Sequence, residues 1–157
     1  MQKNPYAGPL GDRDPFQSLG ETPDRIRDVV SRWGDAQWNG SYEPGKWTGR
    51  EILVHLAQTE LALTTRVRFA LSEDNYRAQP FSQDAWMANE TGVDGKTALD
   101  AYLALRRLNV RLFRGLTPEQ RRRPFQHPEY GELNPEWVAA QLAGHDLHHL
   151  AQLERIK

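Results

Sequence analysis

The segment GHDLHHLAQLERI, from Gly144 to Ile156, contains the residues of this chain that are best suited to bind a metal. His145 and His149 are spaced i,i+4, so on a helix their Cβ atoms lie on one face about 6 Å apart. Two imidazoles at this spacing can bind one metal ion. The spacing gives similar support to a second interpretation, in which both histidines are partly buried and hydrogen-bonded to polar neighbours.

Two neighbouring residues leave undecided which histidine is the partner of His145 and whether a carboxylate orients the ligands. His148 lies on the adjacent edge of the same helical face and competes with His149 as the partner of His145. The i,i+4 spacing and the continuation of the stripe to Gln152 favour His149. Asp146 could orient a metal ligand, but a carboxylate exposed to solvent is the simpler expectation.

A third histidine, His55, lies far upstream within EILVHLAQ. An imidazole that faces a helical core needs a polar partner, and a metal shared with two histidines of a facing helix would supply one. Three histidines with open coordination positions are typical of a catalytic metal site, because a structural site is closed by a fourth protein ligand. The alternative for His55 is a hydrogen-bonded histidine at the edge of the core.

Other candidates carry weaker signals. His127 lies in the proline-flanked loop FQHPEY and is expected at the surface or at the rim of a site. Trp47 and Trp86 could line a pocket, although aromatic residues at helix ends more often belong to the core. The arginines at 121–123 are expected in a solvated turn.

The composition restricts the chemistry further. The 157 residues include 5 His and no Cys, which excludes disulfides, cysteine-bound metal clusters and a thiol nucleophile of the protein's own. The formal charge of -1 argues against a nucleic-acid partner. No apolar run approaches the roughly 20 residues that cross a membrane, and the first residues lack the apolar core of a signal peptide. One domain over residues 1–157, located in the cytoplasm, is therefore expected.

Four stretches with helical periodicity are the elements that must position the histidines. They cover residues 23–33, 48–71, 97–115 and 135–156. Thr22 and Pro23 predict the start of the first stretch. Thr48 followed by Glu51 is a capping-box pattern, and Asn134 is expected to cap the last stretch.

These stretches together predict an all-α fold, a four-helix bundle. The second stretch has an apolar stripe that is expected to be buried, formed by Ile52, Leu56, Leu63, Val67 and Ala70. In the third stretch, Arg106 and three further arginines lie toward the C-terminal end, where the helix dipole favours cations.

The connections between the stretches are unequal. Residues 72–96 form the longest link, which is long enough to cross the bundle and permits the second and third helices to run parallel. Residues 1–20 are rich in Gly, Pro and Asp and are predicted to form an extended arm. The sequences PEQRRR and EYGE predict a short helical turn and a tight turn before the last helix.

Two motifs at these positions resemble the DinB/YfiT-like superfamily: WTGREILVHL over residues 47–56 and HDLHHLAQL over residues 145–153. The segments LTPEQ and HPEYGEL resemble the same family, and the resemblance extends from about residue 20 to the C-terminus. It implies an up-down-down-up four-helix bundle with a long crossover between the second and third helices. It also implies a divalent metal, nickel or zinc, bound by His55, His145 and His149.

The resemblance further implies a small-molecule substrate, because characterised members are transferases and an isomerase that use a small thiol such as bacillithiol or mycothiol. The leading hypothesis is an enzyme whose metal activates either a thiol cosubstrate or water, with His148 as a candidate base in the second case. The alternative is a metal-binding or stress-related bundle protein that acts through protein interactions without turnover. A DNA-associated role, suggested by the family name, conflicts with the charge of -1. A homodimer through the exposed face of the third helix is also expected.

Overall fold

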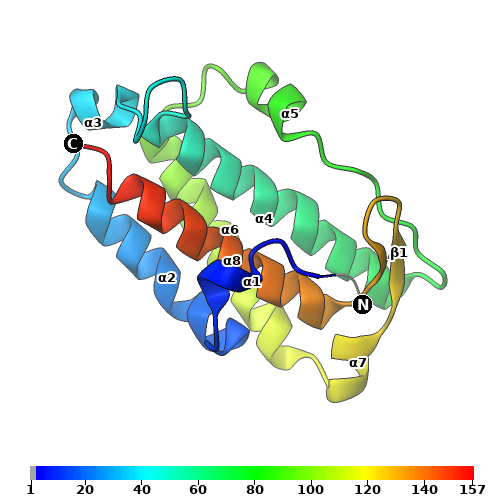
Figure 1. The fold of residues 1–157 in the computed structure, drawn as a ribbon. Coiled ribbons are helices and arrows are strands. Elements are labelled where there is room, and N and C mark those ends of the chain that lie inside the picture. Colours follow the sequence, from blue (N-terminus) through cyan, green and yellow to red (C-terminus); the bar gives the residue numbers. More distant parts are fainter. Residues whose placement is uncertain (1–2) are drawn as a thin grey trace.

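A computed structural model of the chain describes residues 3–157, in which four long helices form a bundle (Figure 1). They are α2 (Pro15–Val30), α4 (Gly49–Ser72), α6 (Gly95–Gly115) and α8 (Pro135–Leu153). Helices α2 and α8 run in one direction along the bundle and α4 and α6 run in the other (Figure 1). The predicted all-α four-helix bundle and its up-down-down-up arrangement are confirmed.

Residues 73–94 connect α4 to α6 and run back along the bundle to the end where α4 begins (Figure 1). This crossover contains the short helix α5 (Gln83–Asn89), which begins after Ser82. Its Met87 is buried and Phe81 packs against the core, so the link covers one side of the bundle. Parallel neighbouring helices require such a return, because their successive ends lie a full helix length apart.

Capping hydrogen bonds begin two of the long helices at the predicted residues. The Thr48 hydroxyl accepts a hydrogen bond from the Glu51 N–H, and the Glu51 carboxylate accepts one from the Thr48 N–H at 2.8 Å. The Asn134 side chain accepts a hydrogen bond from the Trp137 N–H at 2.8 Å and caps α8. The expected stripe of α4 is buried: Ile52, Leu56, Leu63, Val67 and Ala70.

The segment between α6 and α8 contains the two turns that its sequence predicts. Helix α7 (Pro118–Arg122) begins after the cap Thr117. Strands β1 (Phe125–His127) and β2 (Gly131–Leu133) then pair antiparallel, with Phe125 opposite Leu133. Gly131 has a φ of 66°, a conformation that glycine adopts without strain, and it closes this hairpin.

The prediction for the N-terminal segment was wrong in two respects. Residues 3–20 do not form an extended arm, because they contain α1 (Ala7–Leu10) and the first turns of α2. Helix α2 begins at Pro15 after the cap Asp14, eight residues before the predicted start at Pro23. Both positions carry the same signal, a capping side chain followed by proline, so the local sequence did not distinguish them.

Pro23 lies inside α2, where its missing N–H leaves the carbonyl of Leu19 without its helical donor. The guanidinium of Arg106 in α6 compensates, because its Nη1 donates to the Leu19 oxygen at 3.4 Å. A side chain from another helix therefore lets α2 continue through a residue that usually ends a helix.

The remaining helix of the described residues, α3 (Asp35–Asn39), closes one end of the bundle with two tryptophans. The rings of Trp33 and Trp38 are 5.1 Å apart and nearly perpendicular. Gly95 at the start of α6 lies directly against Trp38, where a Cβ atom would come within 2.2 Å of the ring. Within residues 3–157, none of the helices has both the length and the apolar character needed to cross a membrane.

Gly144 allows the N-terminal segment to lie directly on α8, because a Cβ there would be 2.3 Å from the carbonyl oxygen of Tyr6. We expect Gly144→Ala to displace the segment around Tyr6 and to lower the free energy of unfolding by about 1–3 kcal/mol. Urea denaturation measures the loss. Gly115→Ala is the control, since a Cβ at that position meets nothing within 4 Å. Equal stability of the two variants would contradict the predicted contact.

Candidate metal centre

Helices α4 and α8 bring three histidines to one point in the interior. The Nε2 atom of His145 lies 2.8 Å from Nε2 of His55 and 3.1 Å from Nε2 of His149. The ligand atoms of all three side chains lie within 4.8 Å of one another, and no carboxylate of residues 3–157 joins the group. The convergence across two helices is the arrangement that the sequence predicts, whereas the role of these residues as ligands stays a prediction.

The three imidazoles are almost fully shielded from solvent, with exposed fractions of 3% for His55 and 4% for both His145 and His149. Burial lowers the pKa of His55 to about 4 and that of His149 to about 3. Burial also lowers the pKa of His145 well below its ordinary value, and the other histidines add to this effect. All three rings are therefore neutral at pH 7, which is the form that binds a metal ion.

These nitrogens fit a metal ion better than they fit one another. The Nε2 atom of a neutral imidazole carries either a proton or a lone pair, so His145 cannot form a linear hydrogen bond with both neighbours at once. A cation would accept all three lone pairs. With metal–nitrogen bonds of about 2.0–2.1 Å in tetrahedral geometry, the ligand nitrogens would lie about 3.3 Å apart. The separations of His145 from its two neighbours, 2.8 and 3.1 Å, are close to this value.

The orientation of His149 is set by a chain of polar side chains. The Oε1 atom of Gln152 lies 2.7 Å from Nδ1 of His149, so this nitrogen carries the proton and leaves the Nε2 lone pair free. The Gln152 amide in turn donates to the hydroxyl of Tyr42 at 3.1 Å. His148 does not join the three converging nitrogens: its Nε2 lies 3.0 Å from the Gln152 amide nitrogen.

Aromatic rings surround the histidines and exclude water from most of their surface. The ring of Trp47 lies 4.7 Å from that of His55, and Phe81 of the crossover stacks on the same imidazole at 6.3 Å. Tyr6 of the N-terminal segment packs its edge against His145 at 4.9 Å. Trp86 contacts Phe81 rather than a histidine, with ring centroids 4.8 Å apart.

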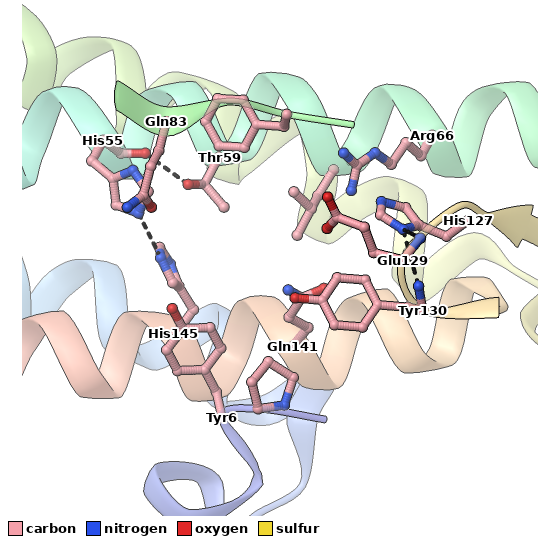
Figure 2. Close-up of a pocket in the computed structure, with 13 residues that line it drawn as sticks. Tyr6, His55, Thr59, Arg66, Gln83, His127, Glu129, Tyr130, Gln141 and His145 are labelled. Atoms are coloured by element: carbon pink, nitrogen blue, oxygen red, sulfur yellow. Dashed lines mark hydrogen bonds between the residues drawn. The ribbon is translucent and has the colours of Figure 1, made fainter. Parts of the chain in front are cut away.

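Two cavities leave the centre open. The first, of about 210 Å³, is bounded by His55 and His145 and extends toward the β1–β2 hairpin (Figure 2). The second, of about 290 Å³, is bounded by His55, His148 and His149 together with Trp47. A small molecule can therefore approach the convergent nitrogens from either cavity.

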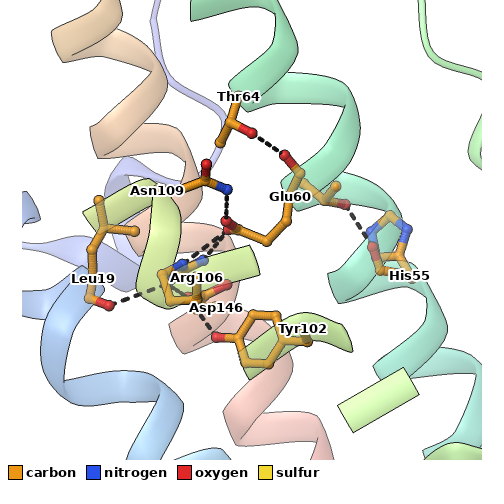
Figure 3. Close-up of polar contacts among 9 residues, drawn as sticks. Leu19, His55, Glu60, Thr64, Tyr102, Arg106, Asn109 and Asp146 are labelled. Carbon is orange, nitrogen blue, oxygen red and sulfur yellow. Dashed lines mark hydrogen bonds and ion pairs between the residues drawn. The ribbon is translucent and has the colours of Figure 1, made fainter. Parts of the chain in front are cut away.

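Asp146 was predicted to face solvent, and this prediction was wrong. Its side chain is 1% exposed, pairs with Arg106 and accepts a hydrogen bond from the hydroxyl of Tyr102 at 3.0 Å (Figure 3). On its other side, Arg106 pairs with Glu60 at 2.5 Å. Asp146 forms no hydrogen bond to a histidine, and it contributes instead to a buried ionic network that joins α4, α6 and α8.

His127 was expected at the surface or at the rim of a site, and the structure places it in the wall of the first cavity. This histidine is 4% exposed, at the end of β1, rather than at the surface. Its Nδ1 accepts hydrogen bonds from the backbone N–H groups of Glu129 and Tyr130, at 3.2 and 3.3 Å. His127 lines the first cavity but lies apart from His55 and His145 (Figure 2) and does not belong to the group of three convergent histidines.

Three features of the site were not predicted from the sequence: Tyr6, Arg66 and the pair formed by Glu60 and Arg106. A signal for that pair was present, because Glu60 follows Leu56 by four residues on the apolar stripe of α4. Arg106 likewise follows Tyr102 by four residues, and both are buried. A charge at a core position of an amphipathic helix indicates a buried partner on another helix. Tyr6 had no comparable signal.

The lowered pKa values predict a distinct acid sensitivity of the metal-free protein. Below about pH 6.5 the unfolded chain protonates His55 and His149, whereas the folded chain keeps them neutral down to about pH 4 and 3. The unfolded state then binds more protons, so the free energy of unfolding falls by about 1.4 kcal/mol per pH unit for each group. Urea denaturation after chelation, at pH 7 and pH 5, measures this slope.

The control for this experiment is His55→Gln, which removes the contribution of one buried imidazole and keeps a polar side chain. Its stability is expected to depend less on pH over the same interval. A slope equal to that of the unchanged protein would contradict the assignment to His55.

The chain is similar in sequence to known proteins. A family model described as the DinB superfamily matches residues 18–153. YfiT of Bacillus subtilis, described as a candidate metal-dependent hydrolase, is 30% identical over 90% of this chain and 81% of its own length. Another candidate metal-dependent hydrolase, from Oceanobacillus iheyensis, is 28% identical over 88% of this chain and 81% of its own.

Two solved structures share the fold. The structure of B. subtilis YfiT, described as an unusual four-helix bundle, matches with a TM-score of 0.83 and 26% identity over 90% of this chain and 83% of that one. The mycothiol-dependent maleylpyruvate isomerase matches with a TM-score of 0.70 over 88% of this chain and 59% of that one. Its identity is 12%, so this second likeness concerns the fold alone.

Proposed function

Because this chain belongs to the DinB superfamily, we propose that it is an enzyme that binds one divalent metal ion through His55, His145 and His149. The metal would serve to activate a small nucleophile, either a thiol cosubstrate or water. One observation carries the proposal: three neutral Nε2 atoms converge between two cavities without a fourth protein ligand within residues 3–157. Such an open set is typical of catalytic metal sites.

A bound divalent ion lowers the pKa of a thiol or water beside it and so supplies a nucleophile near neutral pH. The protein's own residues supply the remaining conditions. Gln152 orients His149, while Trp47 and Phe81 keep bulk water away from the imidazoles. A dry surrounding strengthens the electrostatic interactions at such a centre.

The two proposed nucleophiles, water and a thiol, require different groups: water requires a base of the protein, and the thiol requires a sulfur-containing cosubstrate. The relatives described as candidate metal-dependent hydrolases support the water version, in which His148 is the candidate base beside the second cavity. The chain has no cysteine, so the thiol version takes its sulfur from a cosubstrate. Zinc and nickel are the proposed ions, since imidazole ligands suit both.

The non-catalytic alternative requires a closed or plugged centre, and the two cavities beside the histidines count against it. A homodimer stays a prediction. The exposed surface of α6 that would form it includes Leu108, which is 57% exposed.

Metal analysis followed by an activity screen tests the proposed function. Purified protein is expected to bind about one equivalent of zinc or nickel, and His55→Ala is expected to lose it. The loaded protein is then assayed with a panel of small thiols and a generic electrophile, and separately with activated esters and amides. Turnover that requires one thiol supports the transferase version, and turnover in water alone supports the hydrolase version. Absence of stoichiometric metal in the unchanged protein would refute both.

A further inference from the structure

Arg66 is a buried cation with no carboxylate close enough for an ion pair among residues 3–157, although the charge of Glu129 acts on it from farther away. It lies on α4, is 9% exposed and lines the first cavity. Its Nη2 donates to the backbone carbonyl of Gln79 at 2.8 Å, and within residues 3–157 it forms no ion pair. A guanidinium has five N–H donors and is costly to bury without compensation, so most of its binding capacity is available to a ligand.

Further hydrogen-bond donors lie near Arg66, at the end of the cavity away from His55 and His145. The Nδ1 atom of His127 is occupied by two backbone N–H groups, so its proton resides on Nε2, which is the donor that remains for a ligand. Tyr130 and Gln141 line the same wall (Figure 2). The exposed Glu129 is the one carboxylate among the lining residues, and its charge opposes a bound anion, more strongly for two negative charges than for one.

The cavity joins this end to the histidine centre. His55, Thr59, Leu63 and Arg66 all line it from one face of α4. The Cα atoms of His55 and Arg66 are about 16 Å apart at 1.5 Å per residue. Long side chains lean toward the N-terminus of a helix, so the guanidinium reaches back toward His55. Leu63 and Phe81 contribute apolar surface between the two ends, beside the side chain of Thr59.

We infer that Arg66, with His127, forms a subsite for a carboxylate, and that the substrate is a small monoanionic acid. Its carboxylate would lie at Arg66 and its reacting group at the three histidines, with an apolar chain between them. The cavity volume of about 210 Å³ is suited to a molecule of this size. The placement of the reacting group rests on the proposed function, whereas the carboxylate subsite does not.

Binding of hexanoate and hexanamide to the metal-free protein tests the subsite without any catalysis. The two probes share an apolar chain and differ in charge. Hexanoate is expected to bind about tenfold more tightly than hexanamide, as charge-assisted hydrogen bonds are the stronger ones, and to shift the ring resonances of His127 in NMR titrations. Arg66→Gln is expected to abolish the preference and Arg66→Lys to retain part of it.

The matched control is Arg107→Gln, which changes the net charge equally at an exposed position of α6 and is expected to keep the preference. Glu129→Gln is expected to strengthen hexanoate binding by removing the competing carboxylate. Equal binding of both probes to the unchanged protein would overturn the inference, as would a full preference in folded Arg66→Gln protein. A separate zinc titration distinguishes the two proposals, because a protein that selects hexanoate through Arg66 but binds no zinc refutes only the proposed function.

Discussion

Replacing His145 by alanine is expected to lower the affinity of the protein for zinc by two to three orders of magnitude. The Nε2 atom of this histidine lies between those of His55 and His149, so its loss removes the central member of the group. Complete zinc sites with four ligands contribute about 10–16 kcal/mol, which is about 2.5–4 kcal/mol per ligand. Competition against a chelator of known affinity measures the change.

His148→Ala is the matched control, since it removes a neighbouring imidazole whose nitrogens lie outside the convergent group. Its zinc affinity is expected to change by less than about tenfold, because this histidine contacts the His149 ring and Gln152 without joining the convergent nitrogens. Comparison of His148→Ala with His149→Ala also decides between the two partners that the sequence left open for His145. If His148→Ala lost zinc while His149→Ala retained it, the proposed ligand set would be wrong.

Replacing Arg106 by methionine is expected to lower the free energy of unfolding by about 3–5 kcal/mol. The change would leave the carboxylates of Glu60 and Asp146 buried without their cation, at exposed fractions of 0% and 1%. Burial already raises the pKa of Asp146 while Arg106 opposes the rise, so the loss of the guanidinium would leave burial unopposed. It would also leave the Leu19 carbonyl without its donor. Urea denaturation measures the loss.

The neighbouring Arg107 is exposed and provides the control, because Arg107→Met is expected to change stability by no more than about 0.5 kcal/mol. A combined replacement by apolar residues, Arg106→Met with Glu60→Leu and Asp146→Leu, is expected to recover much of the lost stability, since no buried charge then lacks a partner. A single Arg106→Met variant as stable as the control would show that the network does not stabilise the bundle.

The ionic network also concerns the proposed function, because it joins the helices that carry the histidines. Asp146 directly follows His145 in α8, and Glu60 lies in α4 five residues after His55. Arg106 of α6 pairs with both carboxylates, so it holds α4 and α8 at a defined separation. We regard Arg106 as a positioning residue, since it acts on the histidines only through these two helices.

Features that depend on a few consecutive residues were predictable from the sequence. The capping box of Thr48 and Glu51 and the cap at Asn134 set helix starts by contacts within three residues. His145 and His149 share a face in any α-helix, so their proximity followed from spacing alone. The long crossover of residues 73–94 likewise permitted parallel central helices before the fold was known.

Features that depend on distant partners required the tertiary structure. Helix α2 starts at Pro15 and continues through Pro23, where Arg106 of another helix supplies a donor to the Leu19 carbonyl. His127 and Asp146 are polar residues in polar sequence, and only their contacts with other elements make them buried.

The sequence by itself determined most of the four long helices, the lack of cysteine and the three histidines that could hold a metal. The tertiary structure alone decided that His55 meets His145 across 90 residues of chain, and that Tyr6, Phe81 and Arg66 surround the resulting cavity. The physical reason is the range of the interactions. Capping and periodicity act within one or two helical turns, whereas burial and convergence depend on side chains that approach only when the whole bundle has formed.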